Sequence, residues 1–327
     1  MGLIGWPVEH SLSPPMHNAA FGAVGLDWHY VPLPVRLAEV VAAVRGLAAL
    51  GLRGANVTVP HKQAVLPVLD FVHPDARAMG AANTLVVKRD PGESPKICGY
   101  NTDVAGFLRA LRQGGFEAEH ANRITVIGAG GAARAVVFGL LRESSASIEI
   151  INRTLNSAVA LVQNLAQDSR DADRLRAVAL TDDTLIESAQ RADLLVNATS
   201  VGLWPKGDES PWPNTVRVPK HLTVFDLVYN PIETILLQQA RESGAMTIDG
   251  LGMLIEQGAL AFELWTGCEA PVHVMRTACE NTLGQRVSLR HTTNQHDTDL
   301  IKIDSTNQSD TCPTSSRRGN AEISDCR

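Results

Sequence analysis

Arg123-Ile-Thr-Val-Ile-Gly-Ala-Gly-Gly-Ala-Ala-Arg134 is the stretch that decides the fold. Its first five residues are typical of a buried strand, its glycines of a tight turn, and the apolar residues 135–141 of a helix. A glycine-rich turn in this strand–turn–helix context indicates a dinucleotide site. The glycines let the backbone approach a pyrophosphate, and the first N–H groups of the helix face its charge. We therefore predict that the pyrophosphate is held by Gly128, Ala129, Gly130, Gly131 and Ala132.

The end of the next predicted strand, Ile148–Ile151, indicates which dinucleotide binds. Asn152, Arg153 and Thr154 follow it, where an NAD site usually places an acidic residue for the ribose 2′-hydroxyl. A guanidinium suits the 2′-phosphate of NADP instead, because its donors match phosphate oxygens. The alternatives are a P-loop and a purely structural turn, and the absence of a Gly-Lys-Ser/Thr ending argues against the P-loop. The sequence therefore predicts NADP(H) as the cofactor.

Composition excludes several classes of protein. The chain has 327 residues, enough for two domains, and its net charge of −6 provides no basic surface for nucleic acid. No uncharged apolar stretch is long enough to span a membrane, and the N-terminus lacks the pattern of a signal peptide. The five cysteines are odd in number and include no C-x-x-C pair, which indicates reduced thiols and no metal site. These features favour a cytoplasmic protein. Apart from composition, we expect a small-molecule substrate as the partner, with the chain a monomer or homodimer.

The first hundred residues alternate between predicted strands and helices. The expected strands cover residues 3–5, 28–33, 54–59 and 81–87, and the expected helices cover residues 17–24, 38–50 and 60–69. This order predicts an α/β domain with a mostly parallel sheet.

Further strands are expected over residues 192–197, 222–226 and 247–249, with helices over 104–111 and 250–265. We predict a substrate domain over residues 1–103, completed by residues 250–285, and a Rossmann-type dinucleotide-binding domain over 104–249. The active site is expected in the cleft between them, at the carboxyl ends of the nucleotide-domain strands. Residues 286–327 are polar and lack periodicity, which predicts a disordered tail.

Polar residues cluster at several points that folding alone does not explain. Ser11 and Ser13 stand two residues apart in a predicted turn, where a helix-capping turn is the simpler interpretation. Asn56 and Thr58 share one face of a predicted strand. Lys62 follows in the first turn of the expected helix over residues 60–69, where the helix dipole would depress its pKa, although a solvated surface lysine is the simpler interpretation.

Three more polar residues complete this set. Asn83 lies in a predicted strand, and Asp103 stands at a predicted helix start, where an N-cap would explain it equally well. The helix N-terminus would keep Asp103 ionised, so that it could pair with Lys62. Gln257 interrupts an apolar helix face, and a buried glutamine needs hydrogen-bond partners that a polyhydroxylated ligand could provide.

Together these segments resemble the shikimate dehydrogenase family. The matching motifs occur in family order over residues 2 to about 285. They are Gly5-Trp-Pro7, His10-Ser-Leu-Ser-Pro14 with His17-Asn18, Asn56-Val-Thr-Val-Pro60 with Lys62, Gly80-Ala-Ala-Asn-Thr84, Gly99-Tyr-Asn-Thr-Asp103, Gly128-Ala-Gly-Gly-Ala132, Asn152-Arg-Thr154, Asn197-Ala-Thr-Ser200, Tyr229-Asn-Pro231 and Asp249-Gly-Leu-Gly-Met253 with Gln257. Several motifs in order are far more specific than any one of them.

The resemblance implies NADPH-dependent, reversible reduction of 3-dehydroshikimate to shikimate in the pathway to chorismate. It implies that Lys62 and Asp103 are the catalytic pair, with Lys62 delivering the proton. The implied substrate contacts are Ser11 and Ser13 for the carboxylate, and Asn56, Thr58, Asn83, Asp103 and Gln257 for the ring hydroxyls, with Tyr229 as a further substrate-binding residue. Thr199 and Gly250 are implied at the cofactor, in addition to the glycine-rich turn and residues 152–154.

Two departures from the family pattern affect these expectations. The first strand is shortened at Met1, and Leu155-Asn-Ser157 stands where the family often carries a second basic residue. NADP preference is therefore expected to depend mainly on Arg153. A quinate/shikimate dehydrogenase that uses NAD remains an alternative, although the paired serines favour shikimate. A non-catalytic NADP-binding regulator is a second alternative, which the presence of both Lys62 and Asp103 disfavours.

Overall fold

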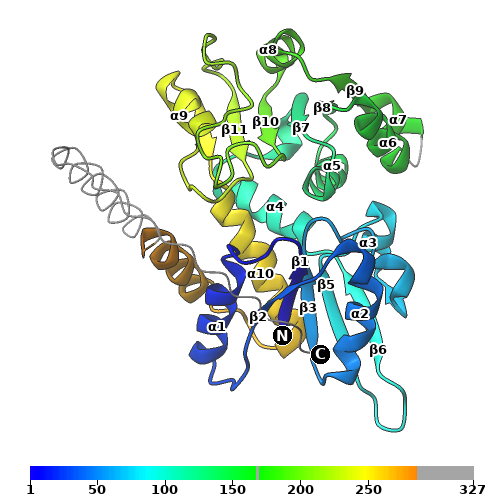
Figure 1. The fold of residues 1–327 in the computed structure, drawn as a ribbon. Coiled ribbons are helices and arrows are strands. Elements are labelled where there is room, and N and C mark those ends of the chain that lie inside the picture. The colour runs from blue at the N-terminus through cyan, green and yellow to red at the C-terminus, as the bar shows by residue number, and fades with distance from the viewer. Residues whose placement is uncertain (167–168, 286–327) are drawn as a thin grey trace, which may run out of the picture. The chain divides into compact units, whose positions relative to one another are not determined.

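The computed structural model describes residues 1–166 and 169–285 (Figure 1). The chain divides into one compact unit, Met1–Leu283, and a second, Gly284–Arg327, and the elements below belong to the first. The predicted tail over residues 286–327 lies outside the described residues.

The first sheet has the strand order β2-β1-β3-β5-β6-β4. Its strands are β1 (Gly2–Gly5), β2 (Val31–Pro34), β3 (Gly54–Val57), β4 (Phe71–Val72), β5 (Thr84–Lys88) and β6 (Lys96–Tyr100). The helical segments between them are α1 (Ser13–Ala23), η1 (Leu37–Glu39), α2 (Val40–Ala49), η2 (Leu66–Val68) and α3 (Pro74–Met79). Strand β1 pairs in parallel with β2 and β3, and β4 with β6, whereas β5 runs antiparallel to both of its neighbours. This is the mostly parallel sheet that the sequence predicts.

The second sheet is parallel throughout, in the order β12-β11-β10-β7-β8-β9. Its strands are β7 (Arg123–Ile127), β8 (Ser147–Asn152), β9 (Leu175–Ala179), β10 (Leu194–Asn197), β11 (Thr223–Asp226) and β12 (Met246–Ile248). The associated helices are α5 (Gly131–Glu143), α6 (Leu155–Leu165), α7 (Ser169–Arg174), α8 (Asp182–Arg191) and α9 (Ile235–Glu242). The strand order reverses between β7 and β10, and such a switch point is where doubly wound sheets bind ligands. The α/β fold with a Rossmann-type sheet is confirmed.

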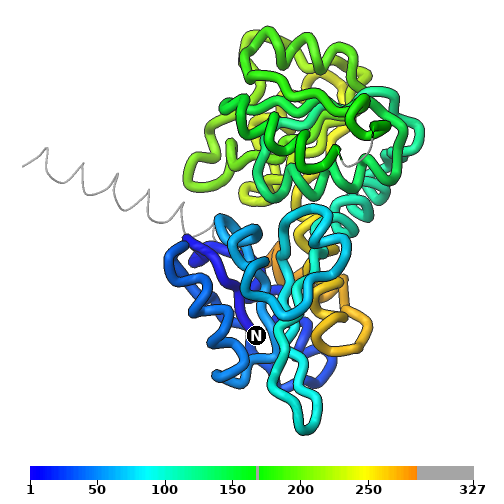
Figure 2. Tube along the Cα trace, turned by 90° about the vertical axis from the view of Figure 1, so that its right-hand side faces the viewer, coloured from blue at the N-terminus to red at the C-terminus, as the bar shows by residue number. Residues whose placement is uncertain are grey.

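Two helices connect the sheets. Helix α4 (Asp103–Gln113) leads from the first to the second, α10 (Gly250–Thr266) returns, and the two pack along each other between the sheets in Figures 1 and 2. Their approach is close because Gly106 has no side chain: a Cβ there would lie 2.8 Å from the backbone nitrogen of Gln257. This contact fixes Gln257 next to the first turn of α4. A short 3-10 turn, η3 (Ala118–His120), precedes β7.

The apolar core follows the same division. One buried cluster joins α4 and α5 to strands of the second sheet and includes Phe107, Val126 and Met79 of α3. Another joins α1 to α10 and to the helical residues 272–283, and includes Phe21 and Phe262. Helix α3 therefore packs into the apolar core of the second sheet, although in the sequence it lies between strands β4 and β5 of the first sheet.

The structure differs from the sequence predictions at several points in the first hundred residues. The expected helix over residues 60–69 is wrong: turns occupy most of this stretch, and only Leu66–Val68 is helical, as a 3-10 turn. Helix α3 and strands β4 and β6 were not predicted, because each is short and none carries a long periodic pattern. Strand β5 begins at Thr84, three residues later than expected.

No helix within residues 1–166 and 169–285 is both long enough and apolar enough to cross a membrane.

Candidate active site

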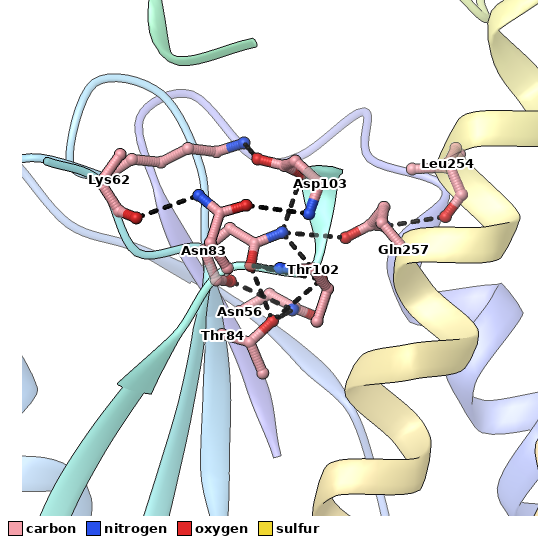
Figure 3. Close-up of polar contacts among 10 residues, drawn as sticks. Asn56, Lys62, Asn83, Thr84, Thr102, Asp103, Leu254 and Gln257 are labelled. Atoms are coloured by element: carbon pink, nitrogen blue, oxygen red, sulfur yellow. Dashed lines mark hydrogen bonds and ion pairs between the residues drawn. The ribbon is translucent and has the colours of Figure 1, made fainter. Parts of the chain in front are cut away.

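Lys62 and Asp103 form an ion pair, with 2.6 Å between Lys62 Nζ and Asp103 Oδ2 (Figure 3). Their side chains are 15% and 6% exposed, so solvent screens this pair less than it would a surface pair. The backbone of Lys62 is held as well, because its carbonyl accepts from Ala82 N at 2.8 Å. The structure thus brings together two residues that the sequence places 41 positions apart.

Lys62 reaches this position from a turn and not from a helix. With no helix over residues 60–69, the helix dipole that was predicted to act on Lys62 does not exist. Asp103 is the first residue of α4 and Thr102 is the N-cap, so Asp103 does not cap the helix as the alternative interpretation supposed. Its carboxylate instead faces Lys62 and Asn83.

Asn83 lies at the centre of the polar cluster (Figure 3). Its Nδ2 donates to Asp103 Oδ1 at 2.8 Å and to Thr102 Oγ1 at 2.9 Å, with Gln257 Oε1 at 3.4 Å. Its Oδ1 accepts from the Thr102 backbone N–H at 2.8 Å. Because both ends of the Asn83 amide are engaged, Asp103 is held in one orientation toward Lys62. Gln257 is half-buried, and its amide donates to Leu254 O at 2.7 Å.

Asn56 lies behind Asn83 and is fixed by three partners. Its Nδ2 donates to Asn83 O at 3.2 Å and to Thr84 Oγ1 at 3.1 Å, while its Oδ1 accepts from the Tyr30 hydroxyl at 2.8 Å. Tyr30 is buried, and burial raises its pKa well above the ordinary value, so it stays protonated as a donor. Tyr30, Thr84 and Thr102 belong to this cluster although the sequence did not single them out. The only signal for them was their position within or beside the predicted strands and the Asn-Thr-Asp motif.

The remaining predicted substrate residues lie around this cluster. Ser11 Oγ accepts from the Ser13 backbone N–H at 3.1 Å, which is a local turn at the start of α1. Ser13 is buried, whereas Thr58, which directly follows β3, is half-buried. Tyr229 follows β11 and packs against the apolar cluster around α1 and α10.

The glycine-rich turn takes a backbone conformation that requires glycine. Gly128 has φ +112°, and a Cβ there would lie 2.9 Å from the carbonyl oxygen of Ala198. Helix α5 starts at Gly131 with Gly130 as N-cap, and no side chain caps it. The first N–H groups of α5 therefore lack intrahelical partners, and they fit the phosphates of a dinucleotide.

Two glycines at helix starts allow close contacts around the predicted cofactor site: Gly131 with Lys62, and Gly250 with Leu227. A Cβ on Gly131 would lie 3.3 Å from Lys62 Cδ, so the start of α5 lies against the lysine stem. Gly250, which begins α10, lies so close to the carbonyl of Leu227 that a side chain there would clash with it. The predicted catalytic lysine and the predicted pyrophosphate turn are thus neighbours.

Residues 152–154 follow β8 as predicted. Asn152 Nδ2 donates to Thr154 O at 2.9 Å, which shapes the turn. Arg153 is exposed and forms no hydrogen bond or ion pair with the described residues, so its guanidinium is available to a ligand. This arrangement fits a 2′-phosphate, for which a planar cation is the preferred partner.

Thr199 is held by a buried network at the ends of β10 and β11. Its Oγ1 donates to Asn197 Oδ1 at 2.7 Å, and Asn197 Nδ2 donates to Asp226 Oδ1 at 2.9 Å. Burial raises the pKa of Asp226 to about 6, although hydrogen bonds from Thr234, Val228 and Asn197 oppose this shift. The network fixes the loop beside Gly128.

Within residues 1–166 and 169–285, no group of three or more His, Cys, Asp or Glu side chains is arranged to hold a metal ion. The three cysteines described, Cys98, Cys268 and Cys279, are free thiols.

Comparison with family models gives matches over most of the chain. Residues 3–85 match the shikimate dehydrogenase substrate binding domain. Residues 110–211 match the shikimate / quinate 5-dehydrogenase model, and residues 250–280 match the shikimate 5'-dehydrogenase C-terminal domain. The first and last of these matches lie within the two predicted segments 1–103 and 250–285.

Individual relatives agree with these matches. The chain is 48% identical over 278 residues to the shikimate dehydrogenase (NADP(+)) of Methanopyrus kandleri, covering 85% of this chain and 93% of that protein. Among solved structures, a shikimate dehydrogenase in complex with NADP+ has 39% identity and a TM-score of 0.75, covering 86% of this chain and 94% of the other. The Thermus thermophilus shikimate 5-dehydrogenase in complex with NADP(H) and shikimate has 38% identity and a TM-score of 0.73, over 86% and 98%. This chain therefore belongs to the shikimate dehydrogenase family.

Proposed function

We propose that this protein catalyses the NADPH-dependent, reversible reduction of 3-dehydroshikimate to shikimate. The observation that carries the proposal is the Lys62–Asp103 ion pair, which is locked by Asn83 and lies against Gly131 of the glycine-rich turn. A proton donor and a dinucleotide site in contact with each other are what a ketone reduction needs. The membership of the family and the NADP- and shikimate-bound relatives support the same reaction.

The proposed chemistry assigns the proton transfer to Lys62. Bound NADPH supplies the hydride to the ketone carbon. Lys62 Nζ gives its proton to the ketone oxygen as negative charge develops there. Asp103 keeps that ammonium charged and pointed at the reacting oxygen, and Asn83 holds Asp103 in place through its 2.8 Å hydrogen bond. In the reverse direction, Lys62 takes the hydroxyl proton of shikimate.

Substrate recognition is proposed for the polar side chains around this pair. Ser11 and Ser13 would hold the carboxylate of shikimate, while its ring hydroxyls would be held by Asn56, Thr58, Asn83 and Gln257, with Tyr229 also in contact. Asn56 already donates both Nδ2 hydrogens within the protein, so it would serve the substrate as an acceptor through Oδ1. Tyr30 would keep that oxygen oriented.

Cofactor binding is proposed for the turn and helix start at residues 128–132, for Thr199, which lies beside Gly128, and for Gly250 at the start of α10. Asn152, Arg153 and Thr154 would contact the adenosine 2′-phosphate, mainly through the exposed guanidinium. The backbone N–H groups at the start of α5, which lack intrahelical partners, would donate hydrogen bonds to the two phosphates of the dinucleotide.

The proposed domain division follows from the two sheets. Residues 1–103 with 250–285 would form the substrate domain, and residues 104–249 the NADP domain. We propose a cytoplasmic site of action and a monomer or homodimer. Analytical ultracentrifugation of the purified protein and fractionation of the source cells would test both statements.

A steady-state assay that crosses shikimate and quinate with NADP+ and NAD+ tests the function. We expect the highest kcat/KM for shikimate with NADP+. A higher kcat/KM for quinate with NAD+ would replace the proposal by the quinate alternative. No turnover with any combination, in a folded protein that binds NADP+, would favour the non-catalytic regulator.

A further inference from the structure

Arg134 is a buried cation that the proposed reaction does not use. It lies in the first turns of α5 and is only 7% exposed. Within the described residues, its hydrogen bond goes to a backbone carbonyl and not to a carboxylate, and its Nε has no hydrogen-bond partner. Burial lowers its pKa, which shows how poorly this environment solvates the charge. A buried arginine without a carboxylate is costly, so its position calls for a reason.

Arg134 donates a hydrogen bond to the last residue of α3. Its Nη1 donates to the carbonyl oxygen of Met79 at 3.1 Å. Met79 is the last residue of α3, so its carbonyl has no partner within the helix, and Arg134 satisfies it. The next residue, Gly80, turns the chain with φ +65°, and a Cβ there would lie 3.8 Å from the same Nη1.

The segment that follows Gly80 enters the catalytic cluster directly. The carbonyl of Ala81 accepts from Asn101 Nδ2 at 3.0 Å, and Ala82 N donates to the carbonyl of Lys62 at 2.8 Å. The next residue is Asn83, which holds Asp103. A shift of Met79 would therefore move the segment 80–83, which carries Asn83 and is hydrogen-bonded to the backbone of Lys62.

Helix α5 makes a second contact near the catalytic residues, at Gly131, one helical turn before Arg134. Gly131 lies against the stem of Lys62, since a Cβ at this glycine would come within 3.3 Å of Lys62 Cδ. The helix that offers its N-terminus to the cofactor thus contacts the lysine at Gly131 and the lysine's supporting segment at Arg134. These two contacts set the separation between the cofactor turn and the proton donor.

We propose that Arg134 is a positioning residue, which fixes the cofactor-binding helix α5 against the segment carrying Asn83 and so sets the distance over which hydride is transferred. This inference rests on the proposed function. Small displacements of reacting groups reduce rates strongly, by about a hundredfold for 1 Å. Binding of either ligand alone does not depend on that distance.

A second arginine of α5 provides a matched control. Arg142 Nη1 pairs with Asp75 Oδ1 at 2.8 Å, which links the same helix to the beginning of α3. This side chain is 54% exposed and lies two turns further from the glycine-rich turn. Arg142→Met therefore breaks a contact between the same two helices without touching Met79.

The test compares Arg134→Met, Arg134→Lys and Arg142→Met in the full chain. Four quantities are measured for each: kcat, the dissociation constants of NADP+ and of shikimate in binary complexes, the melting temperature, and the kinetic isotope effect with shikimate deuterated at the carbon that is oxidised. For Arg134→Met we expect kcat to fall about ten- to a hundredfold and the isotope effect to rise, because hydride transfer becomes limiting. Both binary dissociation constants should stay within about threefold of wild type. Arg134→Lys, which keeps one donor, should lie between this variant and wild type.

Arg142→Met should keep the kcat and the isotope effect of wild type. The proposal is overturned if Arg134→Met lowers only the melting temperature, or if it weakens NADP+ alone. It is also overturned if both Met variants change kcat and the isotope effect equally. Absence of shikimate turnover in the wild-type protein would contradict the proposed function instead, so the two failures are distinguishable.

Discussion

The two sides of the candidate site are built in different ways. On the substrate side, side chains hold one another: Asn83 binds Asp103, Asp103 binds Lys62, and Tyr30 binds Asn56, all largely out of water. On the cofactor side, the backbone is the binding element: Gly128 takes a positive φ, and the start of α5 leaves its N–H groups without partners. Arg153 on this side is exposed.

The difference indicates what each side has to do. Proton transfer needs a donor that is held in one place, and a network of short hydrogen bonds holds it there. Because each side chain of the network supports the next, substitution of one disturbs the others. A dinucleotide brings its own charge, so the protein needs only free donors at the right places. Substitutions in the hydrogen-bonded network around Lys62 and Asp103 should therefore act mainly on kcat, and substitutions of side chains that would contact the bound dinucleotide should act mainly on affinity.

Lys62→Ala should have the largest effect. General acid–base groups contribute about 10²–10⁴-fold, so we expect kcat to fall at least about a hundredfold, with a smaller change in the KM for shikimate. Asp103→Asn should do similar damage, and the double variant should be little worse, because both residues serve one proton transfer. Lys88→Ala, at an exposed lysine, is the control. A nearly unchanged kcat in folded Lys62→Ala would remove the proposed mechanism.

Arg153→Ala should affect binding and leave kcat at saturation near wild type. Charge-assisted hydrogen bonds contribute about 1.5–3 kcal/mol, so NADP+ should bind roughly ten- to a hundredfold more weakly. NAD+ lacks the 2′-phosphate and serves as the internal control, with a nearly unchanged dissociation constant. Calorimetric titration of both dinucleotides measures this, and equal weakening of the two would mean that Arg153 is structural.

The burial of His17, on the substrate side, should make the free energy of unfolding depend on pH. His17 is buried and stacks on Tyr30 at 4.5 Å, and burial lowers its pKa to about 3. The folded protein keeps His17 neutral, while the unfolded chain protonates near its ordinary pKa of 6.5, so stability is unaffected above that pH and is lost as the pH falls below it. Between pH 7 and 5 the loss is about 2 kcal/mol.

Urea unfolding at both pH values measures this contribution. His17→Asn should lose less stability than wild type between pH 7 and 5, whereas His29→Asn, at an exposed histidine, should behave as wild type. An equal loss in wild type and His17→Asn would show that His17 is not the group that titrates.

Deletion of residues 286–327 should have the smallest effect. The segment is polar and lacks apolar periodicity, so it can contribute little to a core. We expect the melting temperature and kcat of the chain that ends at Gln285 to equal those of the full chain. A decrease of several degrees, or a loss of turnover, would show that the segment packs on the enzyme.

Local patterns predicted the parts of the fold that depend on near neighbours in the sequence. The strand Arg123–Ile127, the turn at Gly128 and the helix after it appear where the sequence predicts them, because glycine conformation and apolar periodicity act within a few residues. The same holds for strand β10 and helix α10. The helix predicted after Pro60 is absent, since proline suits a first helical turn but equally suits other turns.

What the sequence by itself determined, then, is the α/β class, the dinucleotide turn with Arg153 after the second strand, and, through ordered motifs, the set of candidate site residues. Only the tertiary structure decided how they meet: that Lys62 pairs with Asp103, that Asn83 and Tyr30 support the cluster, and that Arg134 reaches Met79. The reason is physical. Conformational preferences act within one or two turns of the chain, whereas hydrogen bonds between residues 20 to 55 positions apart exist only once the sheets and helices have packed.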